Sequence, residues 1–447
     1  MPLDREIARQ RVTPAEAAER VRAVDTLAVG LGPCQPPLFL HALGKRDDFE
    51  KLLVFGALLT GLYELFTRSG VTLLSGFFGP VERGLREAGH DVRFVAADFR
   101  RFAHFARRLA PRVMATLAAP PDADGRLSLS LHAGATVEEL HRCGRDPGRL
   151  LVVEVSPKLP RTLGLPPEHP HALSLDEVDL LIEGDADPFY LPDAPPSETE
   201  RAIAAHAARF IPDGATLQTG IGGIPSEIVE LLAEGPGGDY GIHTEMFTTG
   251  LMHLHRRGKV TNRKGVYDGF SACTFAAGTR ELYEWLDGQE GVRFLPVEAI
   301  NAPSIVARNR RMISINGALA VDLAGQIAAD RIGPRQYSGV GGHEDFVHGA
   351  GFAEGGRSLV CLPSTARVRG PDGDRVVSRI AASFCRGELV TTPRHQVDVV
   401  VTEHGAAELA GATDEERAER LLAIAHPDFR DALREEAAAR GLRARSA

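Results

Sequence analysis

Short apolar runs alternate with helical patterns along most of this chain, and this alternation limits its fold more than any other feature. Four runs have the length and composition of buried strands, at residues 150–155, 178–182, 358–362 and 397–402. Helical patterns lie between them, as at 226–233 and 280–286. This order is typical of helices packed on a mainly parallel sheet. The sequence therefore predicts the α/β class.

The order helix, strand, glycine turn, helix occurs twice. Thr13-Pro-Ala-Glu16 and Ser197-Glu-Thr-Glu200 each have the sequence of a capping box that begins a helix. A strand and a glycine turn follow in both places, at 26–32 and 216–222. The repeated order indicates two similar units, and an internal duplication would explain it.

A stretch rich in proline and acidic residues, Gly184–Ser197, separates the two blocks. We therefore expect two similar open, mainly parallel-sheet α/β domains, residues 1–190 and 196–447. Ligands of such sheets lie beyond the carboxyl ends of the strands. This rule predicts an active site in the crevice between the two domains.

The composition excludes several classes of protein. A chain of 447 residues with 43% hydrophobic and 25% charged content can bury a substantial core. Its net charge of −9 gives no reason to expect nucleic acid as a partner. Five scattered cysteines without a CxxC pair predict reduced thiols and a cytoplasmic location. No stretch approaches the ~18 uninterrupted apolar residues of a membrane helix, and the N-terminus lacks an apolar signal core.

Glu245 is the main candidate for chemistry. It stands within residues 241–250, at an expected junction of strand and helix, with no charged neighbour for several residues on its C-terminal side. This isolation predicts a partly desolvated carboxylate, and removal from water makes a carboxylate a better nucleophile. The same residues also fit a carboxylate that caps a helix or interacts with its dipole, which is the commoner arrangement.

Two glycine-rich segments are candidates for ligand contact. In Gly220-Ile-Gly-Gly-Ile-Pro225 the missing side chains let backbone N–H groups approach an anion, although a plain tight turn is an alternative. A dinucleotide site is disfavoured because Pro225 replaces the third glycine of its motif. Gly339-Val-Gly-Gly342 can aim backbone amides at an oxyanion, or form an ordinary hairpin turn.

These candidates stand among other short motifs, at residues 158–164, 314–319, 322–326, 362–367, 400–405 and 425–430. Together the segments resemble the acetyl-CoA hydrolase/transferase family, particularly its 4-hydroxybutyrate and butyryl-CoA transferase branch. The resemblance covers nearly the whole chain and is strongest from about Gly214 to Leu433. In that family, the glutamate matching Glu245 is the nucleophile that carries CoA as a glutamyl thioester.

The resemblance implies a CoA-transferase that moves CoA between a short-chain acyl-CoA and a free carboxylate such as acetate, by ping-pong chemistry through Glu245. A short-chain acyl-CoA hydrolase using the same glutamate and a non-catalytic acyl-CoA-binding protein are the alternatives. Coenzyme A is then a co-substrate, and we expect no tightly bound cofactor. We also expect a homo-oligomer, whose subunit count the sequence does not give.

The resemblance also implies roles for individual residues. Glu245 is the expected catalytic residue, with the backbone amides of Gly341 and Gly342 at the oxyanion. The residues expected to bind CoA are Gly220, Gly222, Gly223, Ile224, Pro225, Ser226, His343 and Arg367. The segment from Phe77 to Ala119 matches the family least well and is expected to hold the acyl pocket.

The chain departs from the family pattern at two places. His343-Glu344 stands where the family has glutamine and an aliphatic residue, and His404 replaces a tyrosine. If that glutamine orients the nucleophile or the acyl carbonyl, His343 adds a pH dependence and Glu344 repels carboxylate acceptors.

The histidines do not predict a metal site. His243, His253 and His255 lie near Glu245, and His343 and His348 lie near the second glycine loop. His253 and His255 are two positions apart on an expected helix, so their side chains diverge, and no set has the spacing of metal ligands. The basic run at 256–264 is either a phosphate contact or a solvated face.

Overall fold

The computed structural model describes residues 7–370, 373–439 and 441. Its internal contacts divide the chain into two units. The first unit contains Met1–Pro192, Glu245–Phe247 and Phe270–Asn301; the second contains Asp193–Thr244, Thr248–Gly269 and Ala302–Ala447.

These units differ from the division expected from the sequence. The first change of unit, after Pro192, falls within the predicted linker. However, Glu245–Phe247 and Phe270–Asn301 lie inside the predicted second domain and belong to the first unit. The physical reason is packing, because Met246, Phe275 and Val297 join a hydrophobic cluster of the first unit.

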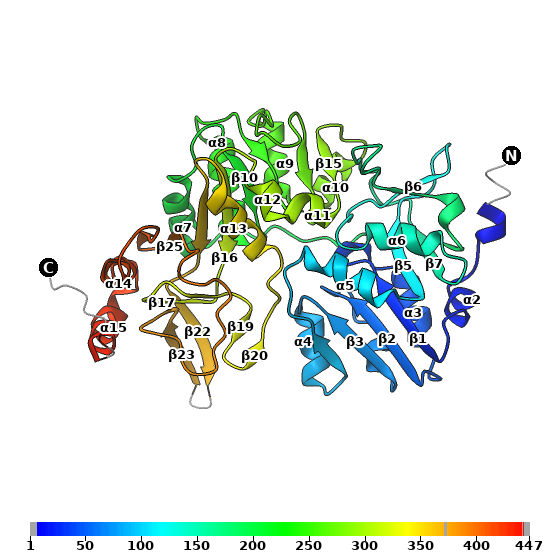
Figure 1. Ribbon diagram of the computed structural model, residues 1–447, viewed down its shortest axis with the longest axis horizontal. Helices are drawn as coiled ribbons and strands as arrows, with labels where there is room; N and C mark the ends of the chain where they lie inside the picture. The colour runs from blue at the N-terminus through cyan, green and yellow to red at the C-terminus, as the bar shows by residue number, and fades with distance from the viewer. Residues whose placement is uncertain (1–6, 371–372, 440, 442–447) are drawn as a thin grey trace. The chain divides into compact units, whose positions relative to one another are not determined.

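The first unit contains a seven-stranded parallel sheet with the order β4-β3-β2-β1-β5-β7-β9 (Figure 1). The strands are β1 (Val24–Val29), β2 (Lys51–Gly56), β3 (Val71–Ser75), β4 (Val92–Phe94), β5 (Val113–Ala118), β7 (Leu150–Val155) and β9 (Leu180–Glu183). In the register of this sheet, Leu27 of β1 lies opposite Val54 on one side and Val113 on the other. The predicted parallel α/β architecture is confirmed for this unit.

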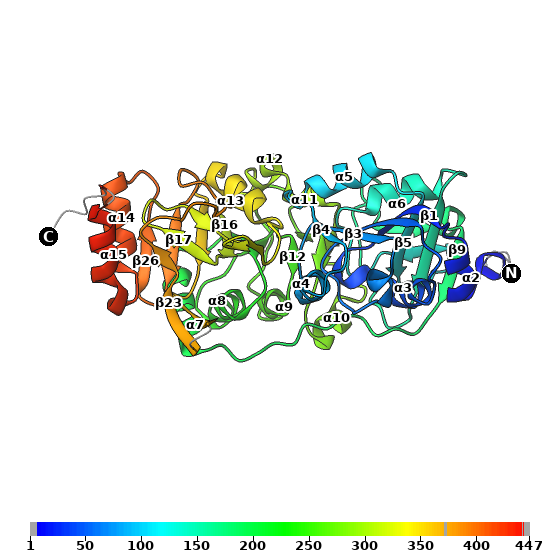
Figure 2. The same cartoon turned by 90° about the horizontal axis from the view of Figure 1, so that it is seen from below.

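Helices cover both faces of this sheet. Figure 2 shows α3 (Pro37–Gly44) and α4 (Pro80–Glu87) on one side, and α5 (Arg101–Leu109) and α6 (Val137–Gly144) on the other. The short helix α2 (Pro14–Glu19) packs on the face of α3. Strands that are buried on both faces are apolar at most positions, which explains the nearly continuous apolar runs of the sequence.

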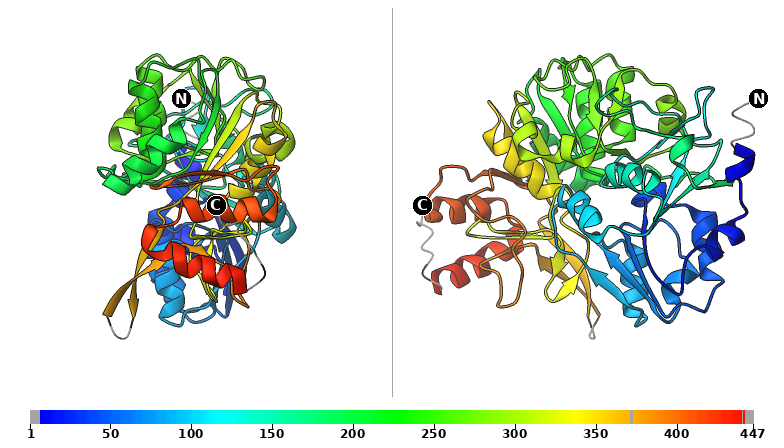
Figure 3. Two further views of the ribbon diagram at one scale, coloured as in Figure 1. Left: turned by 90° about the vertical axis from the view of Figure 1, so that its left-hand side faces the viewer. Right: turned by 45° about the vertical axis from the view of Figure 1, so that its right-hand side comes forward.

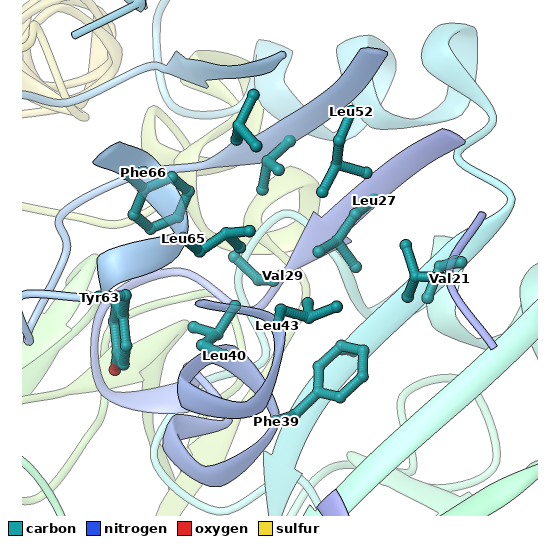
Figure 4. Close-up of a cluster of buried hydrophobic side chains, with 14 of the residues drawn as sticks. Val21, Leu27, Val29, Phe39, Leu40, Leu43, Leu52, Tyr63, Leu65 and Phe66 are labelled. Carbon is teal, nitrogen blue, oxygen red and sulfur yellow. The ribbon is translucent and has the colours of Figure 1, made fainter. Parts of the chain in front are cut away.

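Alternate residues of each central strand enter two separate cores. Leu27 and Val29 of β1 belong to the cluster beneath α3, whereas Ala28 between them belongs to the cluster beneath α5 and α6. Figure 4 shows the first cluster, in which side chains of β1 and β2 meet those of α3 and of the segment from Tyr63 to Phe66.

The remaining elements of the first unit include pairs of short strands. The antiparallel pair is β6 (Arg126–Ser128) with β8 (Ala172–Ser174), and the parallel pairs are β12 (Met246–Phe247) with β14 (Phe275–Ala276) and β13 (Ser271–Cys273) with β15 (Val292–Phe294). Two further helices are α10 (Arg280–Leu286), which matches its predicted range, and α11 (Val297–Asn301).

The second unit contains a six-stranded sheet with the order β11-β10-β16-β21-β25-β26, parallel except for the last pair. Its strands are β10 (Thr216–Thr219), β11 (Gly241–Ile242), β16 (Met312–Gly317), β21 (Arg357–Cys361), β25 (Val399–Thr402) and β26 (Gly405–Glu408). The apolar runs predicted as strands at 358–362 and 397–402 therefore form β21 and β25.

The helices of the second unit are α7 (Glu198–Ala208), α8 (Gly223–Glu234), α9 (Thr249–Arg256), α12 (Pro303–Val306), α13 (His343–Phe352), α14 (Asp414–Ala423) and α15 (Pro427–Ala439). Figure 3 shows α14 and α15 side by side, and Leu421 and Leu433 of these helices join a core with Val360 and Val400 of the sheet. The two predicted capping boxes are present, at Thr13 before α2 and at Ser197 before α7.

Seven short strands complete the second unit: β17 (Ala320–Asp322), β18 (Ile327–Ala328), β19 (Arg331–Ile332), β20 (Arg335–Gln336), β22 (Thr365–Gly370), β23 (Gly373–Ser378) and β24 (Ile380–Ala381). The hairpin of β22 and β23 extends away from the rest of its unit (Figures 1 and 3). Among the described residues, no helix is long and apolar enough to cross a membrane. All five cysteines are free thiols, four of them buried and Cys385 exposed.

Candidate active site

Glu245 lies between β11 and β12, just before the helix α9, as the sequence predicts. Its side chain is partly buried. Its backbone carbonyl accepts hydrogen bonds from the amides of Thr274 (3.0 Å) and Phe275 (3.1 Å). The N-cap of α9 is Thr248, so Glu245 does not cap this helix. The backbone of Glu245 is therefore fixed by pairing with the strand β14 rather than by a helix end.

The carboxylate of Glu245 is held by an asparagine that the sequence analysis did not select. Nδ2 of Asn301 donates a hydrogen bond of 2.6 Å to Oε2 of Glu245. Asn301 is completely buried and is the last residue of α11. This hydrogen bond fixes the orientation of the carboxylate. In the sequence, Asn301 is distinguished only by its position at a helix end, two residues before Pro303.

Hydrogen bonds connect the surroundings of Glu245 to the carboxyl end of the first unit's sheet. The amides of Ala133 and Gly134 donate to the carbonyl of Thr274, and the ring of His132 stacks on Phe275 with 5.5 Å between ring centres. In the same loop, the carbonyl of His132 lies 3.8 Å from Sγ of Cys34, which follows β1. Glu245 is thus joined to loops that follow the carboxyl ends of strands, where α/β folds place their ligands.

Two buried histidines near this region are uncharged at neutral pH. Burial lowers the pKa of His132 to about 3 and that of His171 to about 4. Nε2 of His171 lies 2.9 Å from the Ser130 carbonyl oxygen, to which it can only donate, and 2.9 Å from the Thr162 hydroxyl. Neither histidine titrates in the range that an acid or base at neutral pH requires.

The loop Gly220–Gly223 connects the end of β10 to the start of α8, in the second unit. Gly222 has a φ of +114°, which side chains rarely adopt, and a Cβ at Gly223 would come within 2.1 Å of Oε1 of Glu200. A Cβ at Gly220 would meet nothing within 4 Å. The fold therefore explains two of these glycines but not Gly220. The loop presents the N-terminus of a twelve-residue helix, a suitable place for an anion.

The second glycine segment leads into α13. Gly341 and Gly342 are buried, and Gly341 has a φ of +57°. His343 follows as the first residue of the helix, where its Nε2 lies 2.9 Å from the Thr392 hydroxyl. The same hydroxyl donates a hydrogen bond to Glu344. His343 and Glu344, which form one of the two departures from the family pattern, are thus bound to one threonine.

The expected pH dependence from His343 is wrong for the neutral range. Burial lowers the pKa of His343 to about 4, so its imidazole is neutral at pH 6 to 8. The sequence showed the residue type at this position but not its burial.

Motifs that lie far apart in the sequence meet at the carboxyl ends of β21 and β25. Ser364 donates from its backbone amide (2.8 Å) and its hydroxyl (2.6 Å) to the carboxylate of Glu403. The ring of His404, the other departure from the family pattern, lies 5.4 Å from that of His426. Three of the short motifs are therefore parts of one contact network.

The motifs at 218–225 and 314–319 also contact each other. Oε1 of Gln218 accepts hydrogen bonds from the amide of Ile315 (3.2 Å) and from Nδ2 of Asn316 (3.3 Å), and Asn316 also donates to Ser314 at 2.7 Å. Gln218 is buried in β10, one residue before Thr219 and the glycine loop. This network fixes the strand end from which the loop begins.

The predicted basic contacts have different environments. Arg367 is exposed on the hairpin strand β22. In the basic run, Lys259 donates to the carbonyls of Gly235 and Gly237, Arg263 pairs with Asp239 at 2.7 Å, and Lys264 is completely buried. The run is therefore not one exposed phosphate-binding face.

The histidines of α9 diverge, as predicted. Nδ1 of His253 lies 3.0 Å from Glu230, whereas His255 is mostly buried and burial lowers its pKa to about 4. In the described part of the chain, no group of three or more His, Cys, Asp or Glu side chains has an arrangement that could hold a metal ion.

Comparison with known proteins identifies relatives over the full length of the chain. The family profile described as the acetyl-CoA hydrolase/transferase C-terminal domain matches residues 278–437. A succinyl-CoA:cyclohexane-1-carboxylate CoA transferase of Geobacter metallireducens is 34% identical over 435 residues, which cover 96% of this chain and 95% of that protein. A butyryl-CoA:acetate CoA-transferase of Anaerostipes caccae is 31% identical, with 98% of each chain covered.

A solved structure extends the similarity to the fold. The crystal structure of RipA from Yersinia pestis matches with a TM-score of 0.89 and 32% sequence identity. The match covers 99% of this chain and 100% of that one.

Proposed function

This chain belongs to the acetyl-CoA hydrolase/transferase family, and on that premise we propose that it transfers CoA from a short-chain acyl-CoA to a free carboxylate through a covalent intermediate on Glu245. The observation that carries the proposal is the 2.6 Å hydrogen bond from the buried Asn301 to the Glu245 carboxylate. Relatives named CoA-transferases that match nearly the whole chain support the same activity.

The first half-reaction uses Glu245 as a nucleophile. One carboxylate oxygen attacks the thioester carbonyl, the C–S bond breaks, and a mixed anhydride forms with release of CoA thiolate. The thiolate then attacks the glutamyl carbonyl of the anhydride, which frees the donor acid and leaves CoA on Glu245 as a thioester. Asn301 holds the carboxylate in one orientation, so less freedom is lost when the attack occurs.

The second half-reaction reverses these steps with a different acid. An acceptor carboxylate attacks the glutamyl-CoA carbonyl and forms a new anhydride, and the released thiolate attacks the acceptor's carbonyl to give the new acyl-CoA. No net proton transfer is needed, because one carboxylate enters and another leaves. The products of each half-reaction leave before the next substrate reacts, so we expect ping-pong kinetics.

Backbone amides of the two glycine segments are the proposed binding groups. Gly341 and Gly342 would donate N–H groups to the oxyanion formed by attack on the thioester. The loop Gly220–Gly223 and the first residues of α8 would bind an anionic part of CoA, because the helix N-terminus presents N–H groups and the positive end of its dipole. Arg367 is exposed, as a contact to a CoA phosphate requires.

A short-chain acyl-CoA hydrolase is the second candidate, because the family name covers both activities. Water that attacks the glutamyl thioester or the anhydride would convert transfer into hydrolysis at the same glutamate. The two functions differ in their dependence on acid: added acetate accelerates CoA transfer, whereas hydrolysis releases CoA without any acceptor.

A mass-spectrometric experiment tests the proposed function. The protein is incubated with acetyl-CoA or butyryl-CoA without acceptor, quenched in acid and digested, and the Glu245 peptide is examined for covalent CoA. We expect the adduct in the wild type and its absence in Glu245→Ala. Glu298→Ala is a matched control, because it removes another partly buried carboxylate of the first unit and should keep the adduct. Turnover of Glu245→Ala at the wild-type rate would refute the assigned nucleophile.

A further inference from the structure

The loop Thr261–Gly269 of the second unit has a strained backbone. Asn262 and Tyr267 have φ angles of +56° and +53°, in the left-handed region that side chains disfavour, and Gly265 and Gly269 also have positive φ. Each such non-glycine residue strains the backbone and persists only where its surroundings hold it. The loop must therefore be held by specific contacts.

Lys264 supplies the central contact within this loop. Its ammonium donates a hydrogen bond of 2.5 Å to the carbonyl of Tyr267. The backbone amides of Lys264 and Gly265 donate to Oδ1 of Asp268, at 2.9 and 2.6 Å. Lys264 is completely buried, and burial lowers its pKa to about 7. Placing a lysine here is costly, since its charged form is removed from water.

The loop Thr261–Gly269 contacts three consecutive residues of the segment that precedes Glu245. A Cβ at Gly241 would come within 2.8 Å of the Lys264 Cβ, so the two backbones pack closely. Oδ1 of Asn262 accepts a hydrogen bond of 3.0 Å from the Ile242 amide. The Tyr267 ring stacks on His243 with an angle of 5° between the rings.

The segment is held on its other side as well. The amide of His243 donates to the carbonyl of Leu217, and the hydroxyl of Thr244 donates to the carbonyl of Thr219. Both acceptors belong to β10. The four residues 241–244 therefore lie between β10 and the loop Thr261–Gly269, and Glu245 is the next residue of the chain.

We propose that Lys264 is a positioning residue for the reaction. Its contacts hold the loop Thr261–Gly269 in place, and this loop fixes the backbone of residues 241–244. The direction in which the chain enters Glu245 is fixed as a result. This inference rests on the proposed function, because it takes Glu245 as the nucleophile. Loss of the Lys264 contact would disturb the geometry in which the Glu245 carboxylate attacks. Such a change affects the rate of the chemical step more than the affinity for acyl-CoA.

The test measures the rate of CoA adduct formation on Glu245 at saturating acyl-CoA, together with KM and thermal stability. We expect Lys264→Met to lower the adduct rate about 10- to 100-fold while KM changes less than about twofold. Asn262→Gly is a second variant in case Lys264→Met does not fold. Glycine accepts the positive φ of that position, so this change removes the acceptor for the Ile242 amide without straining the backbone, and we expect the rate to fall in the same direction.

Lys259→Met is the matched control. Lys259 also donates to backbone carbonyls, those of Gly235 and Gly237, but on a different turn of the second unit. We expect it to lower the melting temperature and leave the adduct rate unchanged. If Lys264→Met and Asn262→Gly form the adduct at the wild-type rate, the positioning role is refuted and the proposed function stands. If the wild type itself forms no adduct and releases no CoA, both proposals fail.

Discussion

Asn301 and Glu245 lie 56 positions apart in the chain, yet the amide of one donates a 2.6 Å hydrogen bond to the carboxylate of the other. Two pieces of local structure bring them together. The strand β12 after Glu245 pairs with β14, and the chain then returns through α10 and β15 to end α11 at Asn301. Asn301 and Glu245 belong to two separate segments of the first unit, and both segments come from the second half of the sequence.

Replacement of Asn301 should impair the chemical step. Asn301→Ala removes the hydrogen bond of 2.6 Å from Nδ2 of Asn301 to Oε2 of Glu245, so we expect the adduct rate to fall about 10- to 100-fold. Asn301→Asp should be worse, since a second carboxylate would then face the first. Asn309→Ala is the control, because Asn309 is equally buried and its side-chain amide donates within its own turn, to the carbonyls of Ile305 and Val306. An Asn301→Ala variant with wild-type rate would show that the bond has no role in the reaction.

Alanine substitutions in the first glycine loop should separate folding from ligand binding. Gly220→Ala places its methyl group where the fold leaves open space, so we expect an unchanged melting temperature and a raised KM for acyl-CoA. Gly222→Ala strains a backbone with φ of +114° and should lower both stability and activity. Melting curves and initial rates measure the two effects. An unchanged KM in Gly220→Ala would argue against CoA binding at that residue.

Acidification should destabilise the protein through its buried histidines. Burial lowers the pKa of His171 and His343 to about 4, whereas an unfolded histidine titrates near 6.5. Between these values the unfolded chain binds more protons, so stability is full above about pH 6.5 and falls as the pH drops towards 4. Each such histidine should cost about 2 kcal/mol at pH 5.

The variant His343→Gln isolates one of these contributions. Melting temperatures of wild type and variant are compared at pH 7.5 and pH 5, and we expect a smaller acid-induced decrease in the variant. The same exchange at the exposed His348 should leave the decrease as in the wild type. Equal decreases in all three proteins would contradict the neutral, buried state of His343.

Two buried serines near β21 should differ in their contribution to stability. The Ser364 hydroxyl donates a 2.6 Å hydrogen bond to Glu403, so Ser364→Ala should cost about 1–3 kcal/mol by leaving a carboxylate with one donor fewer. The hydroxyl of Ser358 is buried and has no hydrogen-bond partner among the described residues, so Ser358→Ala should change stability by less than about 1 kcal/mol. Denaturant unfolding compares the two variants, and equal losses would contradict the role given to the Glu403 contact.

Elements with strong local patterns could be predicted from the sequence. The apolar run at 150–155 and the helix at 280–286 have the predicted bounds, and both capping boxes begin helices. These features depend on neighbouring residues, which a sequence shows directly. The two parallel sheets follow from the alternation of such elements.

Features that depend on distant residues could not be predicted in the same way. The strand β12 has two residues, and nothing in Met246–Phe247 indicates that Phe275–Ala276 is its partner. Asn301 belongs to the candidate site only because that pairing exists. The burial that keeps His343 neutral depends on Thr392 and other residues far along the chain.

The interleaving of the two units also determines when each can fold during synthesis. The chain changes unit after Pro192, Thr244, Phe247, Gly269 and Asn301. The first unit therefore lacks Glu245 with the strand β12 that follows it, and the helix that ends in Asn301, until about two thirds of the chain has been synthesised. A polypeptide released at the proline-rich linker would contain the seven-stranded sheet without Glu245, so the candidate site can assemble only late, after both intervening segments of the second unit have been made.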